Sequence, residues 1–237
     1  MRSFIFALLL GLAACTNPIS DWLVSKAYPP VVNKVGEVTI QGMLNEKVEE
    51  KFTQELKVLR NDPSVKAILV TMDTPGGELT VASNMEEELE KVKVPVVVWC
   101  NHLCVSGGYY IITANSVKFV AIRRETIIGD VGIIAMYQDL PKDPSVHVFV
   151  TGNHKVIGAA HPMTKEEEAY VKQDVAKAAA RFFARVKAAR PNLSSAVWAQ
   201  VQEGDTWSGA EAVSAGIPDA VMTYEQAYEK AARLGGL

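Results

Sequence analysis

Two strongly apolar segments constrain the fold of this chain more than any other feature. Residues 67–72 and residues 95–100 are almost entirely apolar. Neither shows the alternation of a strand with one face in water, so both are expected to be strands that are covered on both faces. Helix-forming sequence follows each of them, at residues 79–92 and from Tyr109 onward. Strands that alternate with helices require right-handed crossovers and a mostly parallel sheet.

The same alternation continues through the rest of the chain. Apolar periodicity predicts a helix over residues 46–60. Capping residues predict a long helix from Thr164 to about residue 189, and short helices that open near Ser208 and Thr223. Further strands are expected at residues 35–41, 117–122, 131–135 and 146–150. The predicted fold class is α/β, with a mostly parallel sheet and a helical C-terminal part.

Composition and charge exclude two classes of protein. The chain has 237 residues, of which 49% are hydrophobic, and this is enough for one α/β domain with its own core. The formal net charge is −3, so the basic excess of a nucleic-acid-binding protein is missing and no nucleic-acid partner is expected. No apolar run reaches 18 residues, so no transmembrane span is expected in the mature chain.

The N-terminal segment has the pattern of an export signal. Arg2 precedes an apolar run at residues 4–12, and small residues lead from the run to Cys15. The segment resembles a bacterial lipobox, in which the cysteine receives a lipid and becomes the first residue of the mature chain. An ordinary signal peptide with an incidental cysteine is the alternative. The expected organisation is a lipoprotein signal over residues 1–15, a linker over 16–34 and one domain over 35–237.

An acyl anchor at Cys15 would tether the protein to a bilayer without spanning it. The expected location is therefore the bacterial cell envelope, on its periplasmic or other extracytoplasmic face. Thr16, which is not an aspartate, follows the cysteine. This residue favours outer-membrane sorting in a cell that has an outer membrane.

Ser106 lies where the second buried strand is expected to turn sharply into a helix. Its hydroxyl would stand at the carboxyl edge of the sheet, with the following backbone N–H groups and the positive end of the helix directed at a developing oxyanion. Gly107 and Gly108 leave room for a substrate carbonyl to approach the backbone. The pattern is compatible with a catalytic serine, but the motif taken alone is more typical of an ordinary tight turn.

A second glycine pair, Gly76 and Gly77, follows the other buried strand. Because parallel strands end at the same edge of a sheet, this pair is expected to lie near Ser106. Its N–H groups could donate to an oxyanion, and the flanking chain could pair with an extended peptide. Taken alone, however, the pair is more typical of a structural type II turn. The glycine patterns of phosphate loops and dinucleotide sites are missing, and no cofactor is expected.

Cys100 and Cys104 flank the end of the strand before Ser106. An exported chain meets oxidising conditions, in which the two could form a disulfide. Their spacing along a strand could also place the Cα atoms too far apart, so the pairing stays open. His102 lies between them, but no second ligand pair of this kind occurs elsewhere, and no metal is expected.

Residues 72–77 and residues 106–110 together resemble the signal peptide peptidase A family of serine peptidases, which has a ClpP/crotonase-type fold. The resemblance extends over about residues 35–235. Further stretches match the family in order: residues 126–133, with Gly129 and Gly132; residues 152–155; and residues 204–219, which end in a G-x-x-A-x-x-x-G-I-x-D pattern.

The resemblance implies a Ser–Lys dyad, with Ser106 as the nucleophile and Lys155 as the general base. A lysine can accept the serine proton only when it is neutral, which requires desolvation. Lys155 follows an apolar segment, whereas Lys165 and Lys172 belong to a charged helix. The substrates implied are short hydrophobic peptides, such as cleaved signal peptides.

The resemblance also implies the oxyanion donors and the assembly. The N–H of Gly107 and that of Gly76 or Gly77 would hold the oxyanion. Neighbouring subunits share each active site in the compact members of the family, so a homo-oligomer is expected. Cys104 and Val105 replace the small residues that usually precede the family's serine, which leaves the size of the pocket open.

Alternatives to the Ser–Lys peptidase stay open. The base could instead be His147, His154 or His161, of which His154, beside Lys155, is the best placed. His102 is expected to lie on the same loop as Ser106 and to be too constrained to act as the base. Acyl-CoA chemistry on a related fold is a distant alternative, against which the export signal argues. The second class of function is a non-catalytic, lipid-anchored scaffold or regulator on the same fold.

Overall fold

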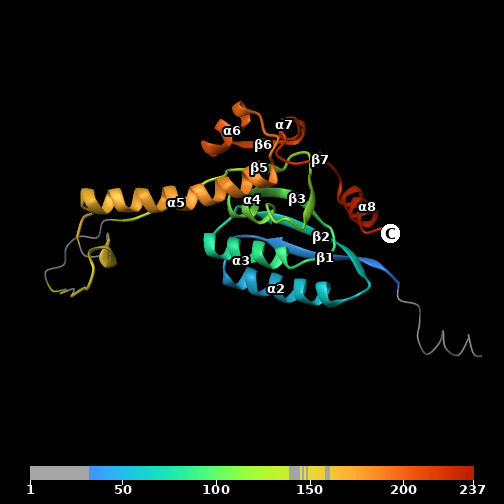
Figure 1. Ribbon diagram of the computed structural model, residues 1–237, viewed down its shortest axis with the longest axis horizontal. Coiled ribbons are helices and arrows are strands. Elements are labelled where there is room, and N and C mark those ends of the chain that lie inside the picture. The colour runs from blue at the N-terminus through green and yellow to red at the C-terminus, as the bar shows by residue number, and fades with distance from the viewer. Residues whose placement is uncertain (1–31, 139–144, 146, 148, 158–160) are drawn as a thin grey trace, which may run out of the picture. The chain divides into compact units, whose positions relative to one another are not determined.

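The computed structural model describes residues 32–138, 145, 147, 149–157 and 161–237 (Figure 1). The signal and nearly all of the linker predicted over residues 1–34 lie outside the described residues. Asn33–Leu237 form one compact unit. Within the described residues, no helix combines the length and the apolar character that crossing a bilayer requires.

A mostly parallel sheet forms the centre of this unit and confirms the predicted class. Its strands are β1 (Lys34–Gln41), β2 (Val65–Thr74), β3 (Val96–Val105), β4 (Val117–Ile122), β5 (Ile127–Gly129), β6 (Thr206–Ser208) and β7 (Ala220–Val221). The main order is β1-β2-β3-β4-β7, and all of these neighbours pair in parallel. β5 pairs in parallel with the end of β3, and β6 pairs antiparallel with β5.

Helices cover the sheet and form most of the C-terminal third. They are α2 (Glu46–Asn61), α3 (Leu79–Glu90), α4 (Gly107–Ile111), α5 (Lys165–Ala189), α6 (Ser195–Gln202), α7 (Gly209–Ser214), α8 (Tyr224–Leu234) and the 3-10 helix η1 (Asn153–Val156). Complete capping boxes open α5 at Thr164 and α8 at Thr223, which confirms both predicted helix starts.

Both faces of the sheet are buried, which explains the continuous apolar runs. Successive residues of β2 alternate between two cores. Ile68 and Val70 belong to the core that includes α2, α3 and α4, whereas Ala67 and Leu69 belong to the core that includes α8 (Figure 1). A strand of this kind has no face in water, so polar residues would be costly at either set of positions.

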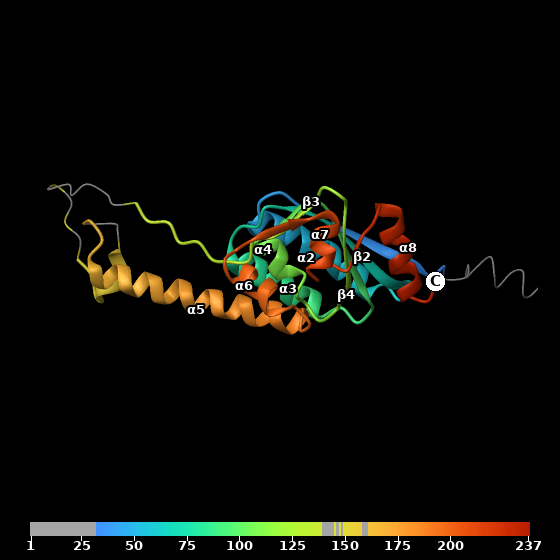
Figure 2. The ribbon, with the colours of Figure 1, turned by 90° about the horizontal axis from the view of Figure 1, so that it is seen from above.

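The N-terminal half of α5 reaches past the edge of the sheet (Figures 1 and 2). Its C-terminal half enters the core, where Phe182 packs on Tyr110 of α4 with ring centroids 5.0 Å apart. Residues 133–135 and Tyr137 line a common cavity with the N-terminal half of α5, and His154 of η1 stacks on Tyr170. We call residues 131–138, 149–157 and 161–177 the arm.

Two of the predicted strands are wrong. The strand expected at residues 131–135 lies earlier, at Ile127–Gly129. Gly129 (φ 118°) and Asp130 (φ 51°) turn the chain out of the sheet, so the apolar residues that follow leave β5. Among residues 146–150, those that the structure describes are not in a strand, and the others lie outside the described residues.

Candidate active site

β3 changes partners on its way to Ser106. Residues 96–100 pair with β4, whereas residues 103–105 pair with β5. The N–H of Ser106 then donates to the carbonyl of Gly129 at the end of β5 (3.0 Å), and α4 begins at the next residue. Ser106 therefore stands at the carboxyl edge of the sheet, at the turn from a buried strand into a helix.

The backbone of Ser106 is strained. Its φ is 52° and its ψ is −121°, and among the described residues other than glycine only Asp130 also has a positive φ. Such a conformation costs about 1–3 kcal/mol and persists only where the surrounding structure enforces it. Because strained residues of this kind gather at active sites, the conformation favours a functional role for Ser106.

Gly76 brings the second glycine turn against this serine. A Cβ atom at Gly76 would lie 2.8 Å from both the Ser106 Cβ and the Gly107 nitrogen, closer than real contacts allow. Gly77 is equally enclosed, since a Cβ atom there would lie 2.3 Å from the carbonyl oxygen of Leu44. The two glycine turns therefore meet at the serine, at a separation that only glycine permits.

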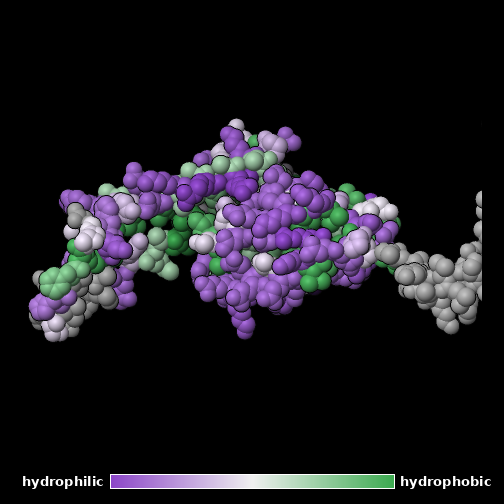
Figure 3. Space-filling model, turned by 60° about the horizontal axis from the view of Figure 1, so that its bottom comes forward, coloured by the Kyte–Doolittle hydropathy of each residue, from purple (hydrophilic) through white to green (hydrophobic). Residues whose placement is uncertain are grey.

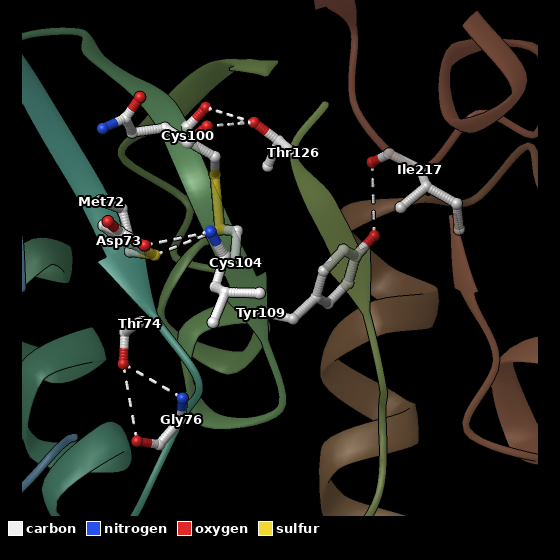
Figure 4. The surroundings of a disulfide bond; sticks show 11 residues. Met72, Asp73, Thr74, Gly76, Cys100, Cys104, Tyr109, Thr126 and Ile217 are labelled. Atoms are coloured by element: carbon white, nitrogen blue, oxygen red, sulfur yellow. Dashed lines mark hydrogen bonds between the residues drawn. A yellow bond between two sulfur atoms is a disulfide. The ribbon is translucent and has the colours of Figure 1, made fainter. Parts of the chain in front are cut away.

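In the part of the chain that the structure describes, the hydrogen bonds of these turns leave two N–H groups beside the serine without a partner. The N–H of Gly76 donates to the Thr74 hydroxyl (3.0 Å; Figure 4), which itself donates to the Gly42 carbonyl (2.7 Å). Among the described residues, the N–H groups of Gly77 and Gly107 make no hydrogen bond. The Gly77 nitrogen lies 3.4 Å from the Cβ position of Gly107. This arrangement favours Gly77 over Gly76 as a donor to an oxyanion.

A cavity of about 430 Å³ opens beside Ser106. Its lining is mainly apolar and includes Met43, Leu79, Ile133, Met136 and Phe182. Two acidic residues, Glu78 and Asp130, also line it. A cavity of this size and character can receive an apolar side chain of a peptide.

Lys155 is not brought to Ser106 within one chain. It lies on η1 with its side chain exposed. Its neighbour His154 stacks on Tyr170 of the arm, with ring centroids 3.8 Å apart. Phe182, which contacts the serine helix, lies twelve residues further along α5, or about 18 Å of helix. Within the described residues, Lys155 therefore makes no contact with Ser106 of the same chain.

The histidines make other contacts. The His102 ring hydrogen-bonds to the Asp73 carboxylate (2.9 Å), and His161 Nδ1 pairs with the Pro162 carbonyl (2.9 Å). In the part of the chain that the structure describes, no hydrogen bond joins a histidine to Ser106. The geometry of one chain therefore lends no support to a histidine base.

Comparison with known proteins agrees with this arrangement. The sequence profile of peptidase family S49 matches residues 88–237, more than half of the chain. The chain belongs to peptidase family S49. The Clp protease profile also matches, over residues 26–128.

Relatives of this S49 chain include Protease 4 of Haemophilus influenzae and a protein of Methanocaldococcus jannaschii that is named as a candidate protease. The first is 26% identical over 219 residues, which cover 86% of this chain and 35% of that protein. The second is 29% identical over 187 residues, which cover 76% of this chain and 59% of that protein. The S49 chain thus spans only part of the length of these relatives.

A solved structure shares the fold of the S49 chain. It is a lysine-to-alanine mutant of the 1510-N membrane-bound stomatin-specific protease in complex with a substrate peptide. The TM-score is 0.55 at 18% identity, and the match covers 85% of this chain and 80% of that chain. At this identity the likeness concerns the fold, and together with the Clp protease match it confirms the ClpP-type architecture.

The S49 chain pairs Cys100 with Cys104 in a disulfide (Figure 4). Their Cα atoms are 5.8 Å apart, within the usual range for a disulfide. In a straight strand the two Cα atoms would be too far apart for a disulfide, but β3 bends between them and brings them within range. Among the described residues, no group of three or more His, Cys, Asp and Glu side chains could hold a metal ion. Cys15 lies outside the described residues.

Two residues that support the S49 site, Thr74 and Tyr109, were not predicted from the sequence. Buried Thr74 fixes the Gly76 turn, and a hydroxyl residue two positions before a turn glycine is a usable signal for that role. The Tyr109 hydroxyl donates to the Ile217 carbonyl (3.3 Å; Figure 4), and burial raises the pKa of this phenol. This bond ties α4 to a segment more than a hundred residues away, which no local pattern reveals.

Proposed function

We propose that this chain is a lipid-anchored serine endopeptidase that uses a Ser–Lys dyad. Its substrates would be short hydrophobic peptides, such as cleaved signal peptides. The observation that carries the proposal is the strained backbone of Ser106, beside an apolar cavity and two N–H groups, of Gly77 and Gly107, that make no hydrogen bond within the described residues. Membership of peptidase family S49 supports the same class of reaction.

In the proposed reaction, neutral Lys155 takes the proton of the Ser106 hydroxyl. The Ser106 Oγ attacks the scissile carbonyl, and the oxyanion accepts hydrogen bonds from the N–H groups of Gly77 and Gly107. Lys155 then protonates the leaving amine as the C–N bond breaks. Lys155 then takes a proton from water, whose oxygen attacks the acyl carbonyl. The ester C–O bond to Ser106 breaks, the Ser106 Oγ recovers a proton from Lys155, and the second product is released.

The lysine comes from a neighbouring copy of the chain in this proposal. The arm that carries Lys155 also exposes large apolar side chains: Ile134 (83% exposed), Met136 (89%) and Phe149 (93%). Figure 3 shows apolar surface along the arm. Contact with a second copy would bury these side chains and remove water from the lysine, as a general base requires. The expected state is a homo-oligomer with shared active sites.

Attachment to a membrane through Cys15 completes the proposal. The signal pattern of residues 1–15 supports export and acylation, and therefore a place on the extracytoplasmic face of the bacterial envelope. Cys15→Ser should release the protein from the membrane fraction and leave its peptidase activity unchanged. Persistent attachment of this variant would contradict the anchor alone.

Hydrolysis of a fluorogenic apolar peptide tests the peptidase proposal. Ser106→Ala and Lys155→Ala should each lower turnover at least about a hundredfold while the circular dichroism spectrum stays the same. Lys165→Ala is the matched control, because it removes another exposed lysine of the arm, and it should retain activity. Undiminished turnover by purified Ser106→Ala would end the proposal.

A serine-directed phosphonate separates the peptidase from the non-catalytic scaffold. The peptidase should be labelled, and peptide mass mapping should locate the adduct on Ser106. A wild-type protein that is neither labelled nor active would favour the scaffold.

A further inference from the structure

We propose that the Cys100–Cys104 disulfide positions Ser106 by closing the bulge of β3 on which the serine is mounted. The inference rests on the proposed function, since it assigns a role in the reactivity of the same serine. It makes the disulfide a positioning element and not a catalytic group.

The disulfide closes a bulge at the point where β3 changes neighbours. In a straight strand, residues four apart would have Cα atoms about 13 Å apart, but those of Cys100 and Cys104 are 5.8 Å apart. The pairing with β4 ends at Cys100, and the pairing with β5 begins at Leu103. The bond therefore joins the two halves of β3 across the bulge, which consists of residues 101–103 (Figure 4).

Hydrogen bonds to the residues in and beside the bulge hold it from two sides. The Asp73 carboxylate accepts from the Leu103 N–H (3.1 Å) and bonds to the His102 ring (2.9 Å). The Thr126 hydroxyl contacts the carbonyl oxygens of Cys100 (2.9 Å) and Asn101 (2.7 Å; Figure 4). These contacts hold the bulge itself, while the disulfide is the covalent link between its two ends.

Ser106 lies two residues beyond this link. Its positive φ requires the surrounding structure to fix both neighbours. On one side, its N–H is fixed by the Gly129 carbonyl, which depends on the register of residues 103–105 with β5. The disulfide fixes the position of residues 103–105, and therefore this register, relative to residues 96–100 of the same strand. Without it, the serine hydroxyl can shift relative to the Gly77 and Gly107 N–H groups.

The bond is protected once it has formed. Cys100 and Cys104 are both 0% exposed, so an external thiol reaches the sulfurs only when the segment opens. Reduction passes two electrons and two protons from an external dithiol, which becomes a disulfide, to the two cysteine sulfurs. We expect reduction to be slow in the native protein and to lower the reactivity of Ser106 when it occurs.

Three variants of the full chain test this role: Cys100→Ala, Cys104→Ala and the double variant. For each, kcat and KM are measured with an apolar peptide, and the rate of phosphonate labelling of Ser106 is followed. We expect kcat and the labelling rate to fall about tenfold or more, because small displacements of a nucleophile are costly. KM should stay within about twofold, since the cavity lining is untouched. All three variants should lose the same amount, because each breaks the same bond.

Val98→Ala controls for the loss of packing, because Val98 is fully buried in the same strand but lies away from the bulge. It should lower the thermal midpoint and leave the labelling rate unchanged. If the cysteine variants fail to fold, wild-type protein treated with dithiothreitol in sub-denaturing urea serves instead. It should show the same loss of labelling, reversed on reoxidation.

Wild-type labelling rates in all three variants would overturn the inference. So would free thiols at both cysteines in the oxidised, active protein, detected as the mass of two extra hydrogen atoms on the peptide of residues 94–118. If wild-type protein is itself neither labelled nor active, the proposed function has failed instead. The two outcomes are therefore distinguishable.

Discussion

Arg185 of α5 donates a 2.7 Å hydrogen bond to Glu86 of α3, whose other carboxylate oxygen is buried without a hydrogen bond among the described residues. Glu86 is fully buried, whereas the Arg185 side chain is 37% exposed. The pair joins the helix that follows the Gly77 turn to the helix that carries the arm. Burial raises the pKa of the Glu86 carboxyl to about 7, although Arg185 opposes the shift.

The raised pKa of Glu86 predicts that stability falls as the pH rises from about 4.5 to about 7. Over this window the folded protein keeps the Glu86 proton while the unfolded chain, with a pKa near 4.5, has lost it. Folding therefore takes up a proton, and the free energy of unfolding decreases with pH by up to about 3 kcal/mol. Glu86→Gln should flatten this part of the profile, as measured by urea denaturation at several pH values.

Glu87→Gln is the matched control for Glu86→Gln, because Glu87 is the exposed neighbour on the same helix. Its pH profile should stay close to that of the wild type, because the Glu87 charge is only a minor cause of the raised pKa of Glu86. Comparison of the variants also cancels every contribution that all three proteins share. Parallel profiles for wild type and Glu86→Gln between pH 4.5 and 7 would show that this carboxyl does not titrate there.

Gly76→Ala should abolish activity. The new Cβ would meet Ser106 and the Gly107 nitrogen, and the residue has a φ of +91°. Gly42→Ala is a control for backbone strain alone, since Gly42 has a φ of +82° but nothing within 4 Å of its Cβ position. That control should lose about 1 kcal/mol of stability and keep its activity. Equal phosphonate labelling of Ser106 in both variants would contradict the close approach.

Thr74→Val should weaken both stability and turnover. It leaves the Gly76 N–H and the Gly42 carbonyl without their hydroxyl partner, which costs about 1–3 kcal/mol. The loosened turn also no longer fixes the Gly77 N–H. Thr74→Ser keeps the hydroxyl and should retain most of the turnover. Thermal melts and kcat measurements compare the two, and equal kcat values would show that the hydroxyl is dispensable.

Mixed oligomers should recover activity from two inactive proteins. If neighbouring copies share a site, the Ser106→Ala protein supplies Lys155 and the Lys155→Ala protein supplies Ser106. After subunit exchange of an equal mixture, about a quarter of the sites should be intact. Turnover of an apolar peptide measures the recovery. Mixed oligomers that contain both proteins and stay inactive would place the two residues in one chain or exclude the dyad.

The local parts of this fold follow from local patterns. The apolar runs of β2 and β3 are continuous because both faces of these strands are covered. The helix starts at Thr164 and Thr223 are readable because a capping box is completed within four residues. By contrast, α6 and the short strands β6 and β7 lack strong periodicity, because so few of their residues face the core.

Local sequence patterns are enough to predict the parallel sheet, the two glycine turns at its carboxyl edge and the serine between a buried strand and a helix, because each depends on neighbours within a few residues. Three other features became visible only in the folded chain: β3 bends enough to join Cys100 to Cys104, the Gly76 N–H donates to Thr74, and Lys155 lies on the arm and away from the serine of its own chain. These outcomes depend on strand register and on contacts between distant segments, which residue periodicity does not encode.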